Sequence, residues 1–225
     1  MAELKFVRTE QPETAAAYLA GWLSGALAAG RPVLWLLSGG SGIATEVAAH
    51  KLVRPELRRH LVMVQVDERY GPIGHPDSNW QQLREAGLRL TDAETALPIL
   101  AGKDLDQTVQ DYTVALGRQL EQADLTIGFF GVGADGHTAG ILPHSSALES
   151  QDLVAAYQGP DFERITITAH VIEQLDEAIV YATGEAKRSQ LEALQRDRPT
   201  ADQPAQLLKR AKAVTIFNDS IGENL

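Results

Sequence analysis

Three short runs of nearly continuous apolar residues constrain the fold of this chain more than any other feature. They lie at residues 33–37 (VLWLL), 61–66 (LVMVQV) and 125–130 (LTIGFF). A strand that is apolar at almost every position, rather than at every second one, is typical of a sheet covered on both faces. The segments between these runs have helical character. The sequence therefore predicts an α/β protein with a doubly wound, mainly parallel sheet and helices on both faces.

The remaining elements continue the alternation of strands and helices. Helices are expected at residues 14–29, 43–53, 80–86, 105–120 and 185–195. Further strands are expected at residues 4–7, 164–169, 179–182 and 213–217, the first of them at an edge of the sheet. Residues 70–78 hold two glycines and two prolines and are expected to form a loop. No internal repeat is visible, and we expect residues 1–225 to form a single domain.

The composition excludes several classes of function. The chain has 20 Lys and Arg against 30 Asp and Glu, a formal net charge of −10, and no cysteine. A nucleic-acid-binding protein needs a basic surface, so we expect no nucleic-acid partner, although a few local cations suffice for a small anion. The lack of cysteine excludes disulfides, thiolate nucleophiles and Cys-ligated zinc. The histidines show no metal-ligand spacing, and we expect neither a metal nor a cofactor.

One apolar stretch, residues 15–30, resembles a secretory signal peptide. Acidic residues at Glu3, Glu10 and Glu13 precede it where a signal peptide has basic ones. No apolar run reaches the roughly 18 residues of a membrane span. We therefore expect a packed helix at these residues, no membrane partner, and a cytoplasmic protein.

A glycine-rich loop, Ser38-Gly39-Gly40-Ser41-Gly42, follows the first apolar run. Glycines let the backbone approach a ligand closely, and the N–H groups at the start of the next helix attract an anion. The hydroxyl groups of Ser38 and Ser41 add two donors. The loop is neither a Walker A motif, which needs a following Gly-Lys-Ser/Thr, nor a nucleophile elbow. It is either a phosphate-binding loop or a plain turn between strand and helix.

A charged loop follows the second apolar run and begins with Asp67-Glu68-Arg69. Three charged residues at the end of a buried strand are costly if they are buried without partners. In a crevice they could serve as acid, base and anion-binding groups. Alternatively, the chain simply reaches the surface there and the charges are solvated.

A second glycine-rich loop, residues 131–138 (GVGADGHT), follows the third apolar run. It matches the G-x-G-x-x-G pattern of dinucleotide-binding proteins. However, Gly140 and Pro143 interrupt the long helix that should follow, which disfavours a nicotinamide-dependent oxidoreductase. The loop also carries Asp135 and His137, an acid and an imidazole two positions apart. Imidazole takes up a proton near neutral pH, and a carboxylate orients it.

Two cations complete the set of candidate residues. Arg164 opens a strand, and Lys187 lies in the first turn of a helix, where it opposes the helix dipole unless an anion is close. Each is more often a solvated charge when considered alone. In a doubly wound sheet, ligands bind beyond the carboxyl ends of the strands. The three loops are therefore expected to share one site.

These motifs, taken in order, resemble the family of glucosamine-6-phosphate isomerases and 6-phosphogluconolactonases. The matching segments are SGGS at 38–41, DER at 67–69, SN at 78–79, GxGxDGHTA at 131–139, RIT at 164–166 and TGxxK at 183–187. The chain departs from the family pattern at Gly42-Ile43, where Thr-Pro is usual, at residues 142–144 and at Gly71. Arg69 and Thr138 match the residues found at these positions in the lactonase branch of the family, whereas the isomerases have other residues at both positions.

The resemblance implies a modified Rossmann fold (NagB/RpiA-like) and hydrolysis of 6-phospho-D-glucono-1,5-lactone without a cofactor. It implies His137 as general base, Asp135 as its orienting partner and Asp67 as a contact to the sugar. Arg69 would face the lactone or share the phosphate. The implied phosphate-binding residues are Ser38, Gly39, Gly40, Ser41, Arg164 and Lys187.

The resemblance also implies a small phosphosugar lactone as the partner, and we expect a monomer or a weak homodimer. Two alternatives stay open. One is a glucosamine-6-phosphate isomerase/deaminase, and the other is a non-catalytic sugar-phosphate-binding protein on the same fold.

Overall fold

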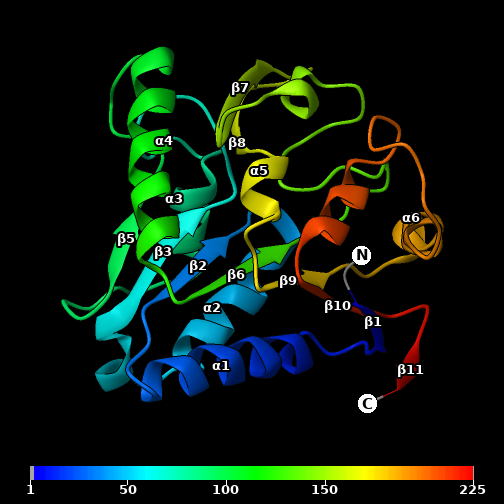
Figure 1. Ribbon diagram of the computed structural model, residues 1–225, viewed down its shortest axis with the longest axis horizontal. Coiled ribbons are helices and arrows are strands. Elements are labelled where there is room, and N and C mark those ends of the chain that lie inside the picture. Colours follow the sequence, from blue (N-terminus) through cyan, green and yellow to red (C-terminus); the bar gives the residue numbers. More distant parts are fainter. Residues whose placement is uncertain (1–2, 225) are drawn as a thin grey trace.

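A parallel β-sheet forms the centre of the molecule (Figure 1). The computed structural model describes residues 3–224; residues 1, 2 and 225 of the expected domain lie outside this range. The strands run in the order β11-β1-β10-β9-β6-β2-β3-β5, and each neighbouring pair is parallel. Their bounds are β1 (Glu3–Arg8), β2 (Val33–Leu37), β3 (Leu61–Gln65), β5 (Thr95–Leu97), β6 (Leu125–Phe130), β9 (Glu177–Tyr181), β10 (Ala213–Asn218) and β11 (Glu223–Asn224).

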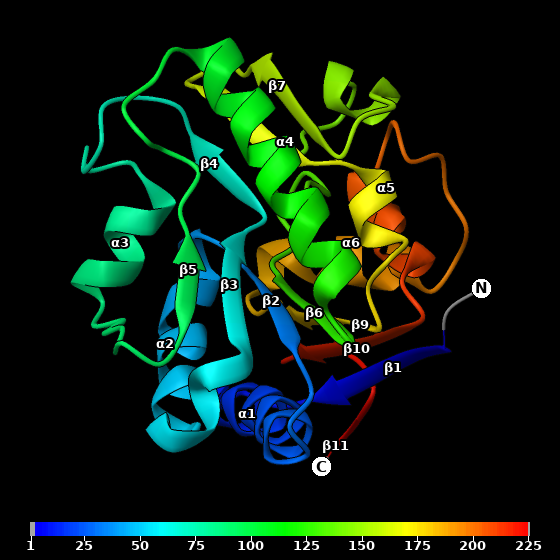
Figure 2. The same cartoon turned by 60° about the vertical axis from the view of Figure 1, so that its left-hand side comes forward.

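Helices cover both faces of this sheet, as expected (Figure 2). One face carries α1 (Pro12–Ala28), α2 (Ile43–Leu52) and α3 (Asn79–Glu85), and the other carries α4 (Leu105–Gln122), α5 (Ala169–Ile172) and α6 (Glu185–Leu194). Strand β2 shows why its sequence is apolar throughout. Trp35 packs into the core beneath α1 and α2, whereas Leu34 and Leu36 pack into the opposite core. The doubly wound α/β prediction is confirmed.

Short 3₁₀ turns connect several of these elements. They are η1 (Gly40–Gly42), η2 (Pro55–His60), η3 (Ser146–Glu149) and η4 (Pro204–Arg210). The expected helices and strands all occur, with ends that differ by a few residues. Strand β5 and the strand β7 described below were not expected, because neither carries a long apolar run. Among residues 3–224, no helix has both the length and the apolar character needed to cross a membrane.

A second, antiparallel sheet contains β4 (Asp67–Arg69), β8 (Glu163–Ile167) and β7 (Val154–Gln158). The prediction of a loop from residue 67 was therefore wrong at its start, because long-range pairing with β8 holds this segment extended. Glu68 is fully buried, and its carboxylate accepts hydrogen bonds from the Ser78 hydroxyl and from the Asn79 and Trp80 N–H groups. This charge thus stabilises the start of α3 and does not face a ligand.

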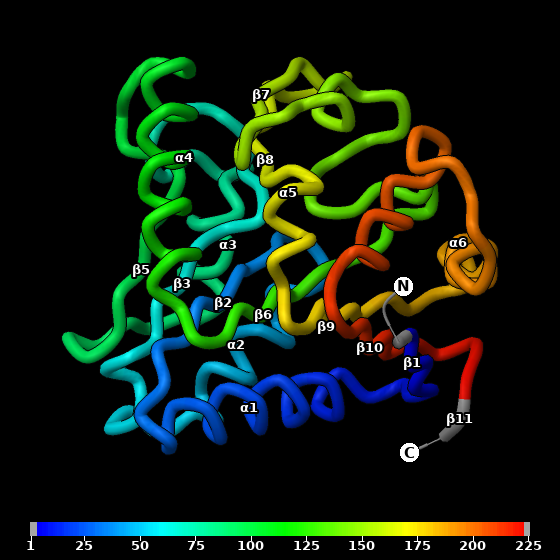
Figure 3. The backbone as a smooth tube through the Cα atoms, viewed as in Figure 1, coloured from blue at the N-terminus to red at the C-terminus, as the bar shows by residue number. Residues whose placement is uncertain are grey.

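The two ends of the chain meet in the main sheet. The tube in Figure 3 shows β1 and β10 side by side, although some 200 residues of chain separate them. Strand β1 was expected at the sheet edge. It lies one strand further in, because Val7 and Arg8 also pair with Glu223 and Asn224 of β11.

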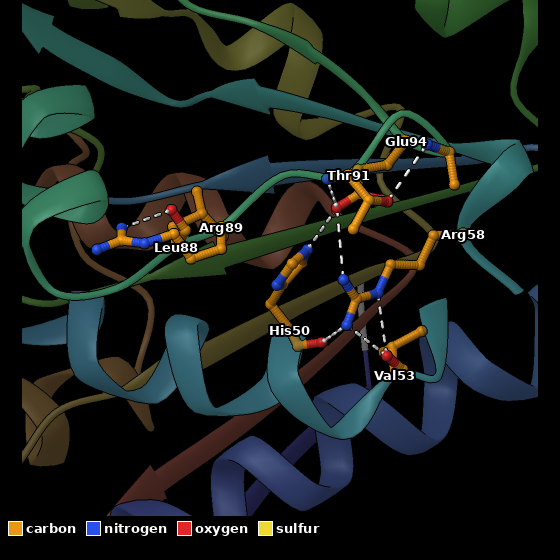
Figure 4. Close-up of polar contacts among 8 residues, drawn as sticks. His50, Val53, Arg58, Leu88, Arg89, Thr91 and Glu94 are labelled. Carbon is orange, nitrogen blue, oxygen red and sulfur yellow. Dashed lines mark hydrogen bonds and ion pairs between the residues drawn. The ribbon is translucent and has the colours of Figure 1, made fainter. Parts of the chain in front are cut away.

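A buried ionic cluster joins α2 to the segments around it (Figure 4). His50 Nε2 lies 3.1 Å from Glu94 Oε1, and Arg58 Nη1 lies 3.4 Å from the same oxygen. Arg58 also donates to the carbonyl groups of His50 and Val53, and Thr91 donates to both carboxylate oxygens of Glu94. These contacts pair the buried Glu94 carboxylate with the Arg58 guanidinium and hydrogen-bond it to His50 and Thr91, as a buried charge requires. They tie the end of α2 to η2 and to the chain entering β5.

Candidate active site

One pocket of about 350 Å³ opens at the carboxyl ends of the central strands. It is lined by Ser38, Gly39, Gly40, Ser41, Asp67, Arg69, Asn79, residues 131–134, His137, Ala139, Gly140, Arg164 and Lys187. Nine of the ten residues predicted for the site thus share one cavity, and the tenth, Asp135, is hydrogen-bonded to His137. The parallel strands bring these loops together because their carboxyl ends lie at the same edge of the sheet.

The SGGS loop turns tightly from β2 through η1 into α2. The Ser38 N–H donates inward to Glu46 Oε1 at 2.7 Å, which leaves the N–H groups of residues 39–41 as the remaining donors of the loop. Gly39 cannot be replaced without a shift, because a Cβ there would lie 2.1 Å from Asn79 Oδ1. The loop therefore has the close approach and the donors of an anion-binding turn.

Two arginines lie opposite each other in the small sheet. Arg69 of β4 pairs in register with Arg164 of β8. Arg69 Nη1 donates to the Asp77 carbonyl at 2.8 Å, Arg164 Nη2 donates to Asp161 at 2.9 Å, and the Nε atom of each arginine is buried without a hydrogen-bond partner. Like charges directly across a ladder are destabilising. An anion in the pocket would relieve this repulsion and use the remaining donors.

Lys187 adds a third cation from the first turn of α6. Its Nζ atom lies 3.4 Å from Ser41 Oγ, which brings α6 and the SGGS loop to the same side of the pocket. Burial lowers the pKa of Lys187, and the nearby Asp219 carboxylate only partly opposes this shift. A partly desolvated ammonium group beside a hydroxyl group favours an anionic oxygen as its partner.

His137 and Asp135 form a hydrogen-bonded pair at the end of β6. His137 Nδ1 lies 2.6 Å from Asp135 Oδ1, and the same oxygen accepts the His137 backbone N–H at 3.1 Å. Burial tends to raise the pKa of Asp135, but these hydrogen bonds and the nearby imidazole outweigh it and lower the pKa overall. Gly133 makes room for the ring, since a Cβ there would lie 2.1 Å from Nδ1. The pair leaves Nε2 free to exchange a proton.

The segment after this pair does not continue as a helix. Thr138 and Ile141 form an isolated antiparallel bridge, and the Thr138 hydroxyl donates to the Gly131 carbonyl at 2.8 Å. A dinucleotide-binding loop would place its pyrophosphate at the N-terminus of a long helix at this point. The geometry agrees with the sequence reasoning that disfavours this class.

Asp67 lines the same pocket, close enough to Arg69, Arg164 and His137 for their charges to affect it. Its residue is 7% exposed, and its carboxylate forms no hydrogen bond with any residue in the range 3–224. Burial raises the pKa of Asp67, and the charges of Arg69, Arg164 and His137 only partly oppose this. This acceptor is therefore available to a ligand hydroxyl group. Within residues 3–224, no three His, Asp or Glu side chains are arranged to hold a metal ion.

Two residues at this site were assigned no role from sequence. Asn79 is buried, donates from Nδ2 to the Asp67 carbonyl at 3.0 Å, and has a buried Oδ1 atom without a partner. Glu46 lies fully buried beneath the SGGS loop. The Ser78-Asn79 pair was visible as part of a motif, but nothing local shows that Asn79 reaches the pocket or that Glu46 points inward.

A parallel α/β sheet with a pocket lined by cations at its carboxyl edge defines a broad structural class of proteins, and comparisons with known proteins identify the family within this class. A family model described as "Glucosamine-6-phosphate isomerases/6-phosphogluconolactonase" matches residues 8–217. The chain belongs to this family. It is 30% identical over 173 residues to the 6-phosphogluconolactonase of Synechocystis sp., with 71% of each chain covered. It is 29% identical to the rat 6-phosphogluconolactonase, where the match covers 71% of this chain but 65% of the rat protein.

Solved structures agree on the fold. A 6-phosphogluconolactonase from Shewanella baltica superposes with a TM-score of 0.79 at 22% identity, covering 97% of both chains. The enzyme from Leishmania guyanensis superposes with a TM-score of 0.80 at 23% identity, covering 97% of this chain and 96% of the other. The whole arrangement of strands and helices is thus shared with these proteins.

Proposed function

We propose that this chain hydrolyses 6-phospho-D-glucono-1,5-lactone to 6-phospho-D-gluconate. The observation that carries the proposal is the division of one pocket into two chemically distinct parts. The His137–Asp135 pair can move a proton, and the group formed by Arg164, Lys187 and the SGGS loop can hold a phosphate. The relatives named 6-phosphogluconolactonase support the same substrate.

The proposed reaction begins with attack of water on the lactone carbonyl carbon. Asp135 accepts the Nδ1 hydrogen bond and so keeps the lone pair on Nε2, with which His137 removes a proton from the water. The tetrahedral intermediate carries a negative oxygen, which the Arg69 guanidinium stabilises in this proposal. The intermediate then breaks its bond to the ring oxygen, and the imidazolium returns the proton to that oxygen. The products are a carboxylic acid and a hydroxyl group, and no covalent enzyme intermediate is required.

The phosphate group is proposed to hold the substrate in position. Arg164, Lys187 and the N–H groups of residues 39–41 would bind it, with Asp67 accepting a hydrogen bond from a sugar hydroxyl group. Binding energy from a group remote from the reacting carbon can be used to orient that carbon. Fixing the reacting groups in this way can lower a barrier by several kcal/mol.

A coupled assay tests the proposal. Glucose-6-phosphate dehydrogenase generates the lactone in place, and the loss of lactone is followed with and without the purified chain, with the uncatalysed hydrolysis subtracted. The proposal expects a rate that rises in proportion to the amount of chain added.

Two results would contradict this assignment within the family. Release of ammonia from glucosamine 6-phosphate faster than lactone hydrolysis would indicate an isomerase/deaminase. Tight binding of 6-phosphogluconate with no turnover of either substrate would indicate a non-catalytic sugar-phosphate-binding protein.

A further inference from the structure

A buried carboxyl group lies directly beneath the phosphate-binding loop. Glu46 belongs to the first turn of α2, and its side chain is fully buried. Its Oε1 atom accepts the Ser38 N–H at 2.7 Å, and its Oε2 atom has no hydrogen-bond partner. Glu46 therefore contacts the loop from the protein interior and does not line the pocket.

The surroundings of Glu46 do not favour a negative charge. Among residues 3–224, no Lys, Arg or His side chain forms an ion pair with it, and Asp67 is the charged group close enough to affect it. An isolated buried carboxylate with a single hydrogen bond is very costly, and such a group instead keeps its proton. Burial accordingly raises the pKa of Glu46 well above its ordinary value; the Ser38 N–H and the Ser38 side chain oppose this rise, and Asp67 adds to it.

The loop sequence fits this arrangement. The Ser38 hydroxyl group is buried within the loop, and a Cβ at residue 42 would lie 2.5 Å from Ser38 Oγ and 3.0 Å from the Phe129 ring. Gly42, one of the departures from the family pattern, thus leaves room for the inward position of Ser38. Because the hydrogen bond to Glu46 holds Ser38 in place, the N–H groups of residues 39–41 keep a fixed position relative to the pocket.

We propose that Glu46 is a positioning residue of the phosphate-binding loop and acts as a neutral carboxylic acid that holds Ser38. A neutral acid supplies the acceptor for the Ser38 N–H without placing a second negative charge beneath the bound phosphate. A carboxylate at this place would repel the phosphate through a medium of low dielectric constant. This inference rests on the proposed function for its ligand, which is a sugar phosphate.

Two substitutions distinguish the role of Glu46 as a hydrogen-bond acceptor from the effect of a negative charge at this position. Glu46→Gln keeps a carbonyl acceptor and a neutral group of the same shape, whereas Glu46→Leu removes the acceptor and leaves the Ser38 N–H unpaired. The affinity for 6-phosphogluconate is measured by calorimetry, so that the test does not depend on turnover. We expect Glu46→Gln to bind within about twofold of the unmodified chain. Glu46→Leu should bind about tenfold more weakly, because the loop donors lose the contact that holds them in position and must be ordered when the ligand binds.

A matched pair of variants controls for simple loss of stability. Glu177 is also buried with one unpartnered oxygen, but it accepts hydrogen bonds from Tyr18 and Thr215 at the opposite end of the sheet. Glu177→Gln and Glu177→Leu should leave the affinity for 6-phosphogluconate unchanged. Infrared difference spectra between the unmodified chain and Glu46→Gln give a second readout, because a protonated carboxyl group has a carbonyl stretch that a carboxylate lacks.

The possible results are distinct. Equal weakening by Glu46→Gln and Glu46→Leu, or the absence of the protonated carbonyl band at neutral pH, would overturn the neutral acid. Unchanged affinity in Glu46→Leu would overturn the positioning role. If Glu46→Leu fails to fold, Glu46→Gln and the infrared band still decide the question. If the unmodified chain binds 6-phosphogluconate but does not hydrolyse the lactone, the proposed function fails while the inference about Glu46 is still tested.

Discussion

At the scale of single residues, the candidate site contains polar side-chain atoms without hydrogen-bond partners and one hydrogen-bonded pair of an imidazole and a carboxylate. Asn79 Oδ1 is buried in the pocket without a partner, and the Asp67 carboxylate beside it forms no hydrogen bond with any residue in the range 3–224. His137 Nδ1 lies 2.6 Å from the Asp135 carboxylate. Buried polar atoms are normally hydrogen-bonded, so exceptions that gather in one pocket point to a ligand. The two residue-scale arrangements, the proton-transfer pair and the acceptors, have separate consequences for kinetics.

Replacing His137 tests the proton-transfer pair. General-base catalysis contributes about 10²–10⁴ to a rate, so His137→Asn should lower kcat by that factor. KM should change little, because the proposed phosphate-binding residues lie on other elements. The stability should also be preserved, because the His137 side chain is 42% exposed and contributes little packing. Steady-state kinetics and circular dichroism of the variant measure both quantities.

A variant that keeps a third of the unmodified turnover would contradict the role of His137 and move the base to Asp67 or Asp135. Loss of activity that accompanies unfolding would instead make His137 a structural residue. Asp135→Asn is the companion variant: it removes the charge that orients the ring and should lower kcat without changing KM.

At the scale of elements, the site is built where strand ends and helix starts meet. Pairing of β4 with β8 puts Arg69 opposite Arg164, and the turn before α6 brings Lys187 to the SGGS loop. These contacts join segments far apart in the chain. A second long-range cluster, His50 with Arg58 and Glu94, holds α2 and therefore the helix that follows the loop.

The cations on β8 and α6 are expected to act on substrate affinity. Lys187→Ala or Arg164→Ala should raise KM about ten- to hundredfold, because each loses a charge-assisted contact with the phosphate. The effect on kcat should be smaller. Arg188→Ala is the matched control on α6, since this half-exposed arginine pairs with Glu192 instead of facing the pocket. Equal turnover of phosphorylated and unphosphorylated gluconolactone would contradict a phosphate-binding role.

The His50 cluster should make stability depend on pH. Burial and the nearby Arg58 lower the pKa of His50, although Glu94 opposes them, so the folded chain binds this proton less readily than the unfolded chain. An unfolded histidine titrates near about 6.5. The unfolded state therefore binds more protons as the pH falls, and the free energy of unfolding should decrease between about pH 7 and 5. It should recover as the pH rises again.

Urea unfolding at several pH values measures this dependence. His50→Gln removes the titrating group and should flatten the slope over this pH range, whatever its effect on absolute stability. His144→Gln is the control, because the His144 side chain is 69% exposed. Equal slopes in the unmodified chain and in His50→Gln would show that other groups cause the dependence.

At the scale of the whole molecule, the local charge of the pocket differs from the net charge, and the main sheet joins the two ends of the chain. The net charge is −10, yet Arg69, Arg164 and Lys187 gather in one pocket, so a local cation cluster can bind an anion within an acidic protein. The main sheet takes strands from both ends of the chain, with β1 between β10 and β11. Because strands from both ends of the chain pair in one sheet, we expect the chain to unfold cooperatively.

We predict that the chain unfolds as one domain. Calorimetric and van't Hoff enthalpies should agree in a thermal scan, as for a two-state transition. Leu19 lies on the buried face of α1. Leu19→Ala should lower the free energy of unfolding by about 2–5 kcal/mol and shift the entire transition. Leu52→Ala, at a residue that is 56% exposed, should change it by less than about 0.5 kcal/mol. A shift of only part of the transition would indicate two domains.

Local sequence was sufficient for the fold class and for most of the candidate site. Apolar runs such as residues 33–37 indicate strands that are buried on both faces. The spacing of apolar residues in helices and the glycines in turns are also local signals. The loops that follow these runs lie at one sheet edge because parallel strands share their direction. This rule brings most of the predicted residues to one place, but Arg164 reaches the pocket because β8 pairs with β4.

Only the tertiary structure decided which polar side chains face the pocket and which lie beneath it. Glu68 stabilises the start of α3, Asp67 beside it faces the pocket, and Glu46 lies under the SGGS loop. In the sequence these three carboxylates look alike. Their environments differ because pairing of β4 with β8, nearly one hundred residues away, sets the register of one segment, and the packing of α2 sets the direction of the other. Register and packing are long-range properties, and no local pattern encodes them.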